Sequence, residues 1–357
     1  MADEQPKQMT EPLVPIEAIQ IIDPEVLKKL RGHVGGIEEF SAITIAGHGS
    51  SLWTRTARID TEFMNERREA IRKSFFLKTT YGANGKEMVV SEEICMLRLH
   101  EMVPDLAPKP LSSGTYSSVR DIHFLLCEFR SMDDKLPPPE ALAPKVAELH
   151  RESVSCPMFG LSHSTFHGSV RVDHGFSKTW ETYFTNSMKK LFDQEQSVQG
   201  PNEEIRQMIE PFFEKVIPRL LRPLEGTISP CLIHGDFWHG NVGTDKETGK
   251  PVIFDAASFY AHNEYELGVW RQPWNKINSD YRKKYHTHFP PSEPVEDCDD
   301  RNALYAIRVN ALDSILYQNE QTYREMLIAG MRELIDKFPG GFEEWETSQH
   351  QSNPSKH

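Results

Sequence analysis

Three oxygen-bearing side chains follow two apolar runs in the second half of the chain. The first run, residues 231–233, leads into His234-Gly235-Asp236, and Asn241 follows five positions after the aspartate. The second run, residues 252–254, ends at Asp255. A positioned carboxylate such as that of Asp236 can take a proton from a hydroxyl. An amide oxygen and a second carboxylate, from Asn241 and Asp255, are the hard ligands that suit Mg²⁺.

A proton acceptor beside a magnesium site is what transfer of a phosphoryl group from a nucleotide to a hydroxyl requires. The spacing also matches His-x-Asp-x-x-x-x-Asn followed by a metal-binding Asp, as in kinase catalytic loops. We therefore assign Asp236 as the catalytic base, and Asn241 and Asp255 as the metal ligands. The alternative is that these residues only shape a glycine-rich turn between two strands. The full set, in register with two apolar runs, favours the catalytic interpretation.

Small residues upstream could contact the phosphates of a nucleotide. Residues 43–46 predict a strand, residues 47–51 a turn, and residues 53–59 the returning strand. Backbone N–H groups of such a turn can face phosphates, so Gly47, Gly49, Ser50 and Ser51 are candidate contacts. The pattern lacks the third glycine of a kinase loop, and most short Gly/Ser hairpins are only turns. Its position ahead of Lys78 favours the nucleotide role.

Lys78 ends an apolar run, residues 74–78, that predicts a strand. A buried lysine there would pair with the α- and β-phosphates as a compact charge. Ser91 is predicted to cap a helix whose first turn carries Glu92 and Glu93. We expect Glu93 to hold Lys78 in place and Glu92 to be only an acid at the helix start. The alternative is an exposed lysine at a strand end.

A proline-rich stretch, residues 130–139, separates two parts of different composition and predicts an interlobe linker. A strand-like stretch begins at residue 108, and residues 122–129 predict a buried strand. We expect the backbone of Glu128, Phe129 and Arg130 to bond the adenine. The sequence predicts an extension at 1–35 that packs on the first lobe or is partly disordered, an N-lobe at 36–129, a C-lobe at 130–345 and a disordered tail at 346–357. Amphipathic helices are predicted over residues 143–152, 203–221, 302–318 and 323–338.

Composition limits the partners. A net charge of −13 argues against a nucleic-acid surface and against anionic membranes. Five scattered cysteines without a C-x-x-C pair favour reduced thiols in a cytosolic or nuclear compartment, and we expect the cytoplasm. The polar N-terminus does not resemble a secretory signal, and no run is long enough to span a bilayer.

Together these motifs resemble the fructosamine (ketosamine) 3-kinase family, relatives of aminoglycoside and choline phosphotransferases. Residues 234–241, His-Gly-Asp-Phe-Trp-His-Gly-Asn, are similar to the family's His-Gly-Asp-Leu-Trp-x-Gly-Asn. Further matches are Phe76-Leu77-Lys78, Glu93 with Leu97, Leu149-His150-Arg151-Glu152-Ser153, Phe159-Gly160, His167-Gly168, and Trp180 with Phe184. The resemblance covers roughly residues 36–335. Three departures stand out, and they bear on acceptor specificity: Asp255-Ala256-Ala257 replaces Asp-Pro-Ala, Asn263 replaces an arginine, and Glu266 replaces an aspartate.

The resemblance implies an α+β, protein-kinase-like bilobal fold, with an antiparallel sheet and one helix in the small lobe and a larger, mainly helical second lobe. It implies ATP and Mg²⁺ as cofactors and the 3-hydroxyl of a ketosamine, on free or protein-bound lysine, as the acceptor. Phosphorylation then destabilises the adduct and releases the amine, which is deglycation. On the resemblance, Trp238 would contact this substrate; alternatively its ring only wedges the loop.

Two other functions are consistent with the same residues. One is a phosphotransferase for another small amino alcohol or an aminoglycoside-like acceptor. The other is a nucleotide-binding scaffold without activity, which predicts loss of Lys78, Asp236, Asn241 or Asp255, and all four are present. The preferred sugar, the preferred amine and the oligomeric state are not defined by these residues.

Overall fold

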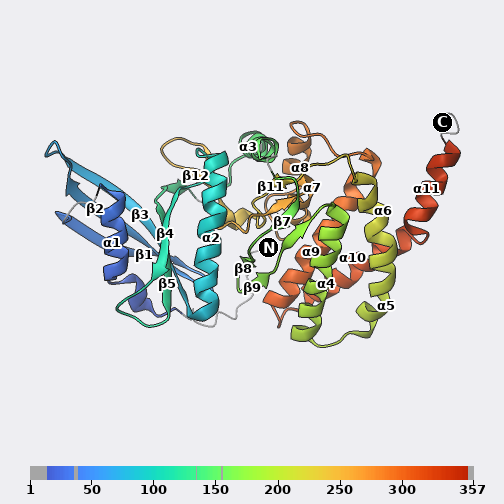
Figure 1. Cartoon of the computed structure of the whole chain (residues 1–357), viewed down its shortest axis with the longest axis horizontal. Coiled ribbons are helices and arrows are strands. Elements are labelled where there is room, and N and C mark those ends of the chain that lie inside the picture. The colour runs from blue at the N-terminus through green and yellow to red at the C-terminus, as the bar shows by residue number, and fades with distance from the viewer. Residues whose placement is uncertain (1–13, 36–38, 134, 154–155, 353–357) are drawn as a thin grey trace. The chain divides into compact units, whose positions relative to one another are not determined.

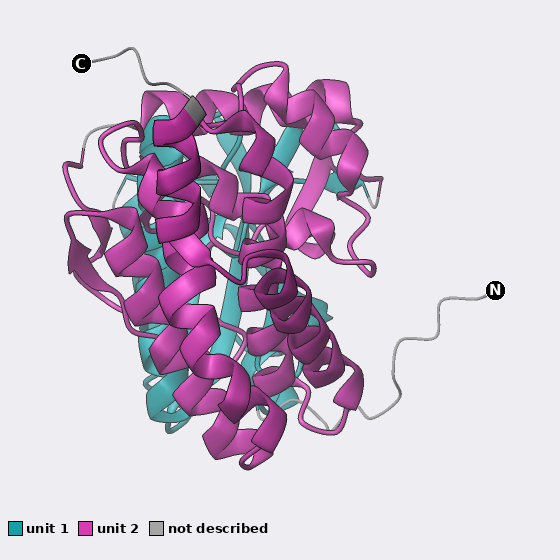
Figure 2. Cartoon of the chain, turned by 90° about the vertical axis from the view of Figure 1, so that its right-hand side faces the viewer, with its two compact units in different colours: residues 1–133, 245–255 teal, residues 134–244, 256–357 magenta. Residues whose placement is uncertain are grey.

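The chain divides into two compact units. The computed structural model describes residues 14–35, 39–133, 135–153 and 156–352. Unit 1 comprises the chain up to residue 133 together with residues 245–255, and unit 2 comprises residues 134–244 and the chain from residue 256 (Figure 1, Figure 2). The division after residue 133 falls inside the proline-rich stretch 130–139. The return of residues 245–255 to unit 1 is a feature that composition does not reveal.

Unit 1 contains a five-stranded antiparallel sheet in the order β1-β2-β3-β5-β4. Its strands are β1 (Ala42–Ser50), β2 (Arg55–Met64), β3 (Ala70–Tyr81), β4 (Pro110–Thr115) and β5 (Ile122–Glu128). Alternate side chains of β2 are buried, as expected for a strand with one face on a core. Two further strands of this unit, β6 (Met132–Asp133) and β13 (Pro251–Ile253), form a small sheet with β12 (Val242–Asp245), the strand that carries the chain from unit 2 into unit 1.

The predicted turn at residues 47–51 is wrong, because β1 continues through both glycines. Gly47 pairs with Ala57 and Gly49 with Thr56, with a register irregularity between the two glycines. The turn comes later, where the Ser51 hydroxyl accepts the N–H groups of Trp53 and Thr54. A bulge absorbs the extra residue and lets the ladder continue. Gly47, Gly49 and Ser50 therefore lie in a strand, and Ser51 builds the turn.

The N-terminal segment from residue 14 is part of the core of unit 1. It forms a short 3₁₀ turn (Ile16–Ile19) and helix α1 (Pro24–His33). The Asp23 carboxylate caps α1 by accepting the Glu25 N–H and also accepts the N–H groups of Ser117 and Ser118. Val26 and Leu30 pack in the hydrophobic cluster of the sheet. The part of the predicted extension before residue 14 lies outside the described residues.

Helix α2 (Gly82–Met102) packs beside β4 and β5 (Figure 1). The helix begins at Gly82, which has a positive φ of 76° that glycine adopts easily. The predicted start at Ser91 is therefore wrong, and Ser91 is buried in the helix interior. Glu92 and Glu93 consequently lie in the middle of the helix, where their directions are set by packing.

Unit 2 is mainly helical. Its helices are α3 (Pro139–Glu152), α4 (Trp180–Gln199), α5 (Glu203–Pro211), α6 (Ile217–Leu221), α7 (Asn263–Glu266), α8 (Ser279–His286), α9 (Cys298–Leu316), α10 (Gln321–Lys337) and α11 (Gly341–Ser352). Its short strands are β7 (Phe159–Leu161), β8 (Thr165–His167), β9 (Val170–Val172), β10 (Gly175–Ser177), β11 (Cys231–Leu232) and β14 (Tyr260–Ala261). A four-stranded sheet has the order β10-β7-β14-β11, and β8 pairs with β9. The helices predicted over 302–318 and 323–338 correspond to α9 and α10.

The predicted helix at 203–221 is continuous but changes its hydrogen-bond pattern. Pro211 and Pro218 lack an N–H, so regular α-helical bonding cannot run through them. The segment Phe212–Val216 forms a π-helical turn between α5 and α6. Its aromatic side chains Phe212 and Phe213 are buried in the cluster that fills unit 2.

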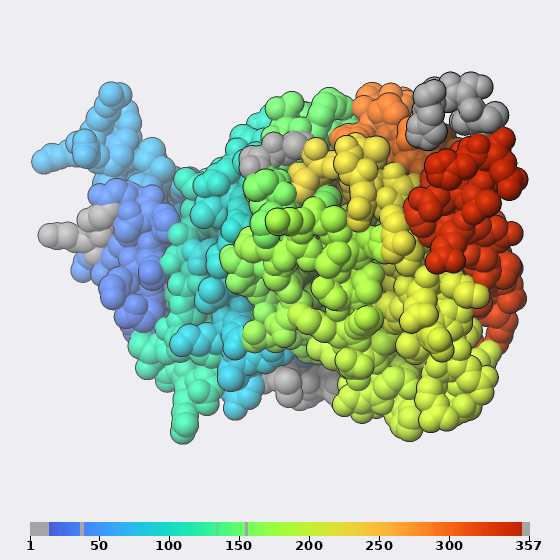
Figure 3. All heavy atoms as spheres, turned by 45° about the vertical axis from the view of Figure 1, so that its right-hand side comes forward, coloured from blue at the N-terminus to red at the C-terminus, as the bar shows by residue number. Residues whose placement is uncertain are grey.

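Residues 346–352 form part of helix α11, so the predicted disordered tail is wrong for this stretch. The guanidinium of Arg219 lies 5.2 Å from the Trp345 ring, and that of Arg222 lies 4.9 Å from the Phe342 ring. Arg219 lies on α6 and Arg222 directly after it, so these cation–π contacts hold α11 beside α6. Figure 3 shows the end of the chain, in red, packed against the body of unit 2. Residues 353–357 lie outside the described residues. Within the described chain, none of the helices combines the length and the apolarity that crossing a membrane requires.

Buried histidines make the stability of unit 2 sensitive to acid. Burial lowers the pKa of His262 to about 4, with the charge of Arg301 acting in the same direction and that of Glu264 opposing it. An unfolded histidine has a pKa near its usual value of about 6.5, so the unfolded chain binds more protons between these two values. The free energy of unfolding therefore falls as the pH drops through this window.

We predict that His262→Gln reduces the stability lost between about pH 7 and about pH 5 by about 2 kcal/mol. Urea unfolding of both proteins at the two pH values measures this difference. His288→Gln, at an exposed histidine of the same unit, is the control and should lose as much stability as the wild type. An equal loss in His262→Gln and wild type would contradict the assignment.

Candidate active site

In unit 1, Lys78 is held between two carboxylates. It lies within β3, opposite Thr56 on β2 and Leu125 on β5, rather than at a strand end. Its side chain is 9% exposed, and its ammonium donates to Glu92 Oε2 at 2.7 Å and to Asp255 Oδ1 at 2.6 Å. A lysine buried in this way needs opposite charge, because desolvation of an unpaired ammonium is costly. The exposed-lysine alternative is excluded.

Glu92, and not Glu93, is the helix carboxylate that binds Lys78. Glu93 Oε2 instead accepts the N–H and the hydroxyl of Ser113 on β4, at 3.0 and 2.5 Å. Adjacent residues of a helix differ by about 100° in direction, so only one of the two can face a given lysine. The expected Lys78–Glu93 pair is therefore wrong. The helix starts at Gly82, nine residues before Ser91, and its orientation on the sheet determines which glutamate faces Lys78.

The charges of this cluster do not cancel. Burial, followed by the neighbouring carboxylate of Asp255, raises the pKa of Glu92 to about 7, while Lys78 opposes the shift. For Lys78, burial favours the neutral amine, but the charges of Asp255 and Glu92 outweigh it and raise its pKa. One ammonium between two carboxylates leaves the cluster short of positive charge, which suits the entry of a cation.

Asp255 follows β13 and has a φ of 59°, in the left-handed region. Non-glycine residues adopt this conformation rarely, and Asp tolerates it better than most. Its side chain is 48% exposed although one oxygen binds Lys78. The carboxylate is thus fixed at one end while the rest of it is open to solvent, where a cation could reach it.

Some groups of the residues predicted to bond adenine already have partners within the protein. The Glu128 N–H donates to the Lys109 carbonyl at 2.9 Å. The Phe129 ring lies 4.6 Å from the guanidinium of Arg58, and Arg130 faces Asp245 at 4.0 Å. The backbone beyond Glu128 remains the predicted adenine contact.

In unit 2, the loop that carries Asp236 depends on a glycine and a buried carboxylate. Gly235 has a φ of 84°, and a Cβ there would lie 2.2 Å from the Ala257 carbonyl oxygen. The Glu266 carboxylate accepts the N–H groups of His234 and Gly235 at 2.5 and 3.0 Å. The Ala257 N–H donates to the His234 carbonyl at 2.9 Å. The family's proline stands at residue 256, whereas this bond is made by residue 257. The replacement of the proline by Ala256 therefore leaves the bond in place.

Another departure, Asn263, lies behind the same loop. Its side-chain N–H donates to the Tyr285 hydroxyl at 2.9 Å, and that hydroxyl shares a hydrogen bond of 2.8 Å with His150 Nδ1. His150 Nε2 then faces Glu266 at 3.6 Å. All of these side chains are buried. Asn263 is therefore part of a buried polar network behind the loop.

Asp236 is held by two residues from different parts of unit 2. Asn241 Nδ2 donates to Asp236 Oδ2 at 3.0 Å, and His167 Nδ1 lies 3.4 Å from Asp236 Oδ1. Arg308 donates to His167 Nε2 at 2.8 Å, which makes Nε2 the acceptor and leaves the proton of a neutral ring on Nδ1, facing Asp236. The side chain of Asp236 is 27% exposed, so it remains accessible.

The same partners keep Asp236 ionised. Burial opposes ionisation, but the hydrogen bond from His167 and the positive charges around it, including Arg308, lower the pKa of Asp236. Burial and the charge of Arg308 in turn lower the pKa of His167, so the ring stays neutral. His167 appeared in the sequence as part of a His-Gly motif without an assigned role. Arg308 lies on α9 and carried no sequence signal.

The donor set fits a magnesium ion. The Asn241 NH₂ group also donates to the Asp236 carbonyl at 2.9 Å, so Oδ1 is the side-chain atom with lone pairs to offer a cation. Among the described residues no cluster of three or more His, Cys, Asp or Glu side chains could hold a metal by itself. Mg²⁺ bound with a nucleotide needs only one or two carboxylates, because phosphates and waters supply the other oxygens.

The Trp238 ring packs over Gly240, where an added Cβ would lie 2.2 Å from the ring. It also contacts the rings of His239 and Trp274, with centroids 5.0 and 6.1 Å away. The side chain is half-buried. Trp238 therefore wedges the loop, and its contact with a substrate remains a prediction.

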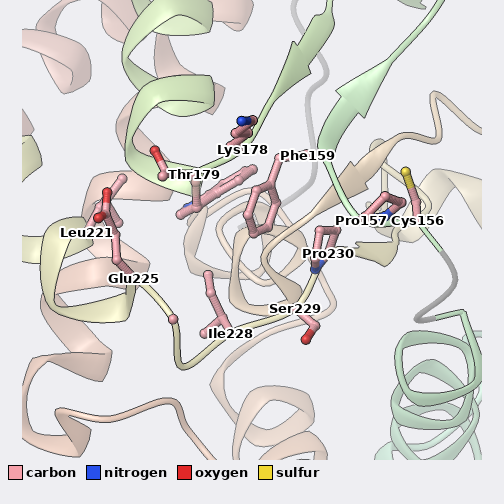
Figure 4. Close-up of a pocket in the computed structure, with 12 residues that line it drawn as sticks. Cys156, Pro157, Phe159, Lys178, Thr179, Leu221, Glu225, Ile228, Ser229 and Pro230 are labelled. Atoms are coloured by element: carbon pink, nitrogen blue, oxygen red, sulfur yellow. The ribbon is translucent and has the colours of Figure 1, made fainter.

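A separate pocket of about 530 Å³ opens elsewhere in unit 2. Lys178 and Thr179 precede α4 on one side of it, Phe159 lies on β7, and residues 225–230 form another wall (Figure 4). The lining includes none of the residues that surround Asp236. This pocket is therefore not the catalytic site.

This architecture, a sheet unit with one lysine-binding helix and a helical unit with a His-Gly-Asp loop, is that of the protein-kinase-like phosphotransferases. It is shared by a candidate fructosamine-3-kinase from Haemophilus somnus 129PT, with a TM-score of 0.67 over 86% of this chain and 96% of that chain at 14% identity. It is also shared by the aminoglycoside phosphotransferase APH(4)-Ia in a ternary complex with AMP-PNP and hygromycin B, with a TM-score of 0.54 over 86% and 97% of the two chains at 13% identity. The predicted fold class is confirmed.

The chain belongs to the fructosamine kinase family, whose model matches residues 48–327. It is 26% identical over 203 residues to the chloroplastic protein-ribulosamine 3-kinase of Oryza sativa subsp. indica, which is 55% of each chain. It is 33% identical over 139 residues to the ketosamine-3-kinase of Mus musculus, 39% of this chain and 43% of that one. The matched stretches thus span about half the length of these relatives. The resemblance inferred from the motifs is confirmed.

The geometry of the loop predicts that a methyl group at residue 235 strongly destabilises the folded protein. Gly235→Ala should lower the free energy of unfolding by more than about 2 kcal/mol, because it combines backbone strain with a steric clash. Gly226→Ala is the matched control: Gly226 has a similar φ of 75°, but nothing lies within 4 Å of an added Cβ. It should cost only about 1–2 kcal/mol. Equal unfolding midpoints of the two variants in thermal denaturation would contradict the clash.

Proposed function

We propose that the protein is an ATP-dependent kinase that phosphorylates the 3-hydroxyl of ketosamines, ribulosamine or fructosamine adducts on free or protein-bound lysine. The observation that carries the proposal is the environment of Asp236, an accessible carboxylate held by His167 and Asn241. The names of the relatives, which include ribulosamine and ketosamine 3-kinases, supply the acceptor class.

Asp236 is the proton acceptor of this reaction. Its ionised carboxylate receives the hydroxyl proton as the bond to phosphorus forms. The His167 N–H and the Asn241 amide fix its direction, so little reorganisation is needed when the acceptor binds. The His167 ring stays neutral and therefore positions the base without competing for the proton.

Lys78 is the ligand of the α- and β-phosphates, and Glu92 is the residue that keeps it in place. Asp255 and Asn241 would hold Mg²⁺, which neutralises charge on the phosphates when it is bound. Only Ala256 separates Asp255 from Ala257, the residue that bonds His234, so the metal carboxylate is covalently close to the catalytic loop. Gly47, Gly49, Ser50 and Ser51 stand as candidate phosphate contacts through the β1–β2 hairpin, and Trp238 as a substrate contact.

An assay of phosphate transfer from ATP separates the acceptor classes. Ribulosyl-lysine and fructosyl-lysine should be phosphorylated, and choline and kanamycin should not. Turnover of kanamycin or choline alone would show that the acceptor is another amino alcohol and not a ketosamine. Nucleotide binding without any turnover would favour a scaffold. The five cysteines form no disulfide among the described residues, which supports a cytoplasmic site for the reaction.

We predict that Asp236→Asn lowers kcat with ribulosyl-lysine by about 10²-fold or more, because an amide cannot accept the proton in the transition state. The KM for ATP should stay near the wild-type value. Steady-state kinetics measures both constants. A wild-type kcat in this variant would remove Asp236 from the base role.

The corrected partner of Lys78 gives a second test. Glu92→Gln should raise the KM for ATP about 10-fold or more, because the lysine loses a charge-assisted hydrogen bond that orients it. Glu93→Gln, one residue along the helix, is the matched control and should leave this KM unchanged. Should Glu93→Gln have the larger effect on the KM, the pairing seen in the structure would not be the one that acts in catalysis.

A further inference from the structure

The catalytic loop of unit 2 is held by a segment whose residues have no role in the proposed mechanism. Residues 270–277, which we call the supporting segment, run from the 3₁₀ turn Val269–Arg271 toward helix α8. Beyond Arg271 this segment forms no regular helix or strand, yet Trp270, Asn275 and Ile277 are buried. The polar groups of a buried irregular segment need protein partners, so its hydrogen bonds show what it holds.

Asn275 makes most of these bonds. Its Oδ1 atom accepts the His239 N–H and the Ile277 N–H, both at 3.1 Å. The Nδ1 atom of the His239 ring lies 3.1 Å from the same oxygen. The Asn275 Nδ2 atom donates to the Val269 carbonyl at 3.0 Å. Because the residue is only 5% exposed, water replaces these bonds poorly, and Asn275 ties the catalytic loop firmly to the supporting segment.

Two further contacts join the same segment to the neighbouring residues of the loop. Trp270 Nε1 donates to the Phe237 carbonyl at 3.0 Å, and the two rings lie 5.6 Å apart. The Trp274 ring lies 6.1 Å from the Trp238 ring in an edge-to-face arrangement. Three consecutive loop residues, 237–239, therefore each contact the supporting segment.

These three residues connect the catalytic base to its amide partner. The Trp238 N–H donates to the Asp236 carbonyl at 3.1 Å, and the Trp238 carbonyl accepts the Asn241 N–H at 3.0 Å. The Asn241 side chain then donates to the Asp236 carboxylate at 3.0 Å. A shift of the loop would thus move Asn241 relative to Asp236 and change the direction of the carboxylate. Small displacements of a catalytic group reduce the rate strongly, even when their origin lies outside the chemistry.

We propose that Asn275 is a positioning residue, which fixes the direction of the Asp236 carboxylate by holding the His239 N–H. The inference rests on the proposed function, in which Asp236 is the base. The atoms that contact this carboxylate come from His167 and Asn241, whereas Asn275 acts through the loop between Asp236 and Asn241. A base keeps its direction only when the residues that carry it are themselves held.

An asparagine suits this position because its amide accepts and donates at the same time. Alanine would leave the His239 N–H, the Ile277 N–H and the Val269 carbonyl without these bonds at a buried site. Buried polar groups that lose their partners destabilise the local structure unless they move to find others. The loop of an Asn275→Ala variant is therefore expected to shift, and Asp236 to shift with it.

The test is a double-mutant cycle on the full-length protein with ATP and ribulosyl-lysine. Asn275→Ala should lower kcat about 10-fold or more, because the base is misdirected. In an Asp236→Asn background the same substitution should lower kcat less than about 2-fold, since no base is left to misdirect. Equal reductions in both backgrounds would overturn the inference, because a general loss of folded structure acts on both alike.

Asn302→Ala is the matched control. Asn302 is a buried asparagine of α9, and its Nδ2 atom likewise donates to a backbone carbonyl, that of Leu267, at 2.8 Å. Its Oδ1 atom accepts from Arg271 and Arg282. The variant should lower the thermal unfolding midpoint and leave kcat at the wild-type value. A fall in kcat as large as that of Asn275→Ala would show that any lost buried amide has this effect, which contradicts a positioning role.

Asn275→Asp provides a second variant should the alanine variant not fold. Aspartate keeps an oxygen that accepts the His239 N–H but loses the group that donates to Val269. Its kcat should lie closer to the wild-type value than that of Asn275→Ala. If it is as slow as the alanine variant, or about 10-fold below the wild type where the alanine variant does not fold, the bond to His239 does not set the rate and the inference is wrong.

Hydrogen exchange followed by mass spectrometry tests the same bond without turnover. The His239 amide should exchange about 10-fold faster in Asn275→Ala, which loses its acceptor, and at the wild-type rate in Asn302→Ala and Asn275→Asp. Unchanged exchange in Asn275→Ala would overturn the inference. Faster exchange in a protein whose wild type phosphorylates no ketosamine would instead refute the proposed function and leave the support of the loop by Asn275 established.

Discussion

Charge held away from water needs a partner, and this requirement determines how both units are built. Lys78 is buried in a sheet and takes two carboxylates, from Glu92 and Asp255. Since one ammonium cannot neutralise both, the cluster keeps a negative excess. A divalent cation and the phosphates it carries complete such a set of charges better than another protein side chain would. The incomplete pairing is thus what suits the cluster to the cation and phosphates of the proposed reaction.

In the loop of unit 2, a buried carboxylate is instead surrounded by neutral partners. Glu266 is buried and accepts the N–H groups of His234 and Gly235, so its charge is stabilised by backbone dipoles. This bond pulls the loop into a tight turn that only glycine can occupy at residue 235. This tight turn places the Asp236 side chain beside His167 and Asn241. One buried acid therefore orients another that remains accessible.

Spacing was enough to predict that Asp236 and Asn241 lie together, because they are five residues apart and meet through local geometry. Spacing could not choose between Glu92 and Glu93, since the choice depends on where α2 begins and how it rotates on the sheet. The sequence predicts a turn at Gly47 and Gly49, because composition does not show that a bulge lets β1 continue. His167 and Arg308 come together from positions far apart in the chain, and no local pattern marks such a contact.

The departures from the family pattern are best explained by what each residue touches. Asn263 lies in a buried hydrogen-bond network behind the loop, and Ala256 directly precedes Ala257, whose N–H bonds the His234 carbonyl. Both positions concern the surroundings of the loop, so neither departure identifies the acceptor. The names of the relatives, and not these substitutions, therefore supply the acceptor class of the proposed function.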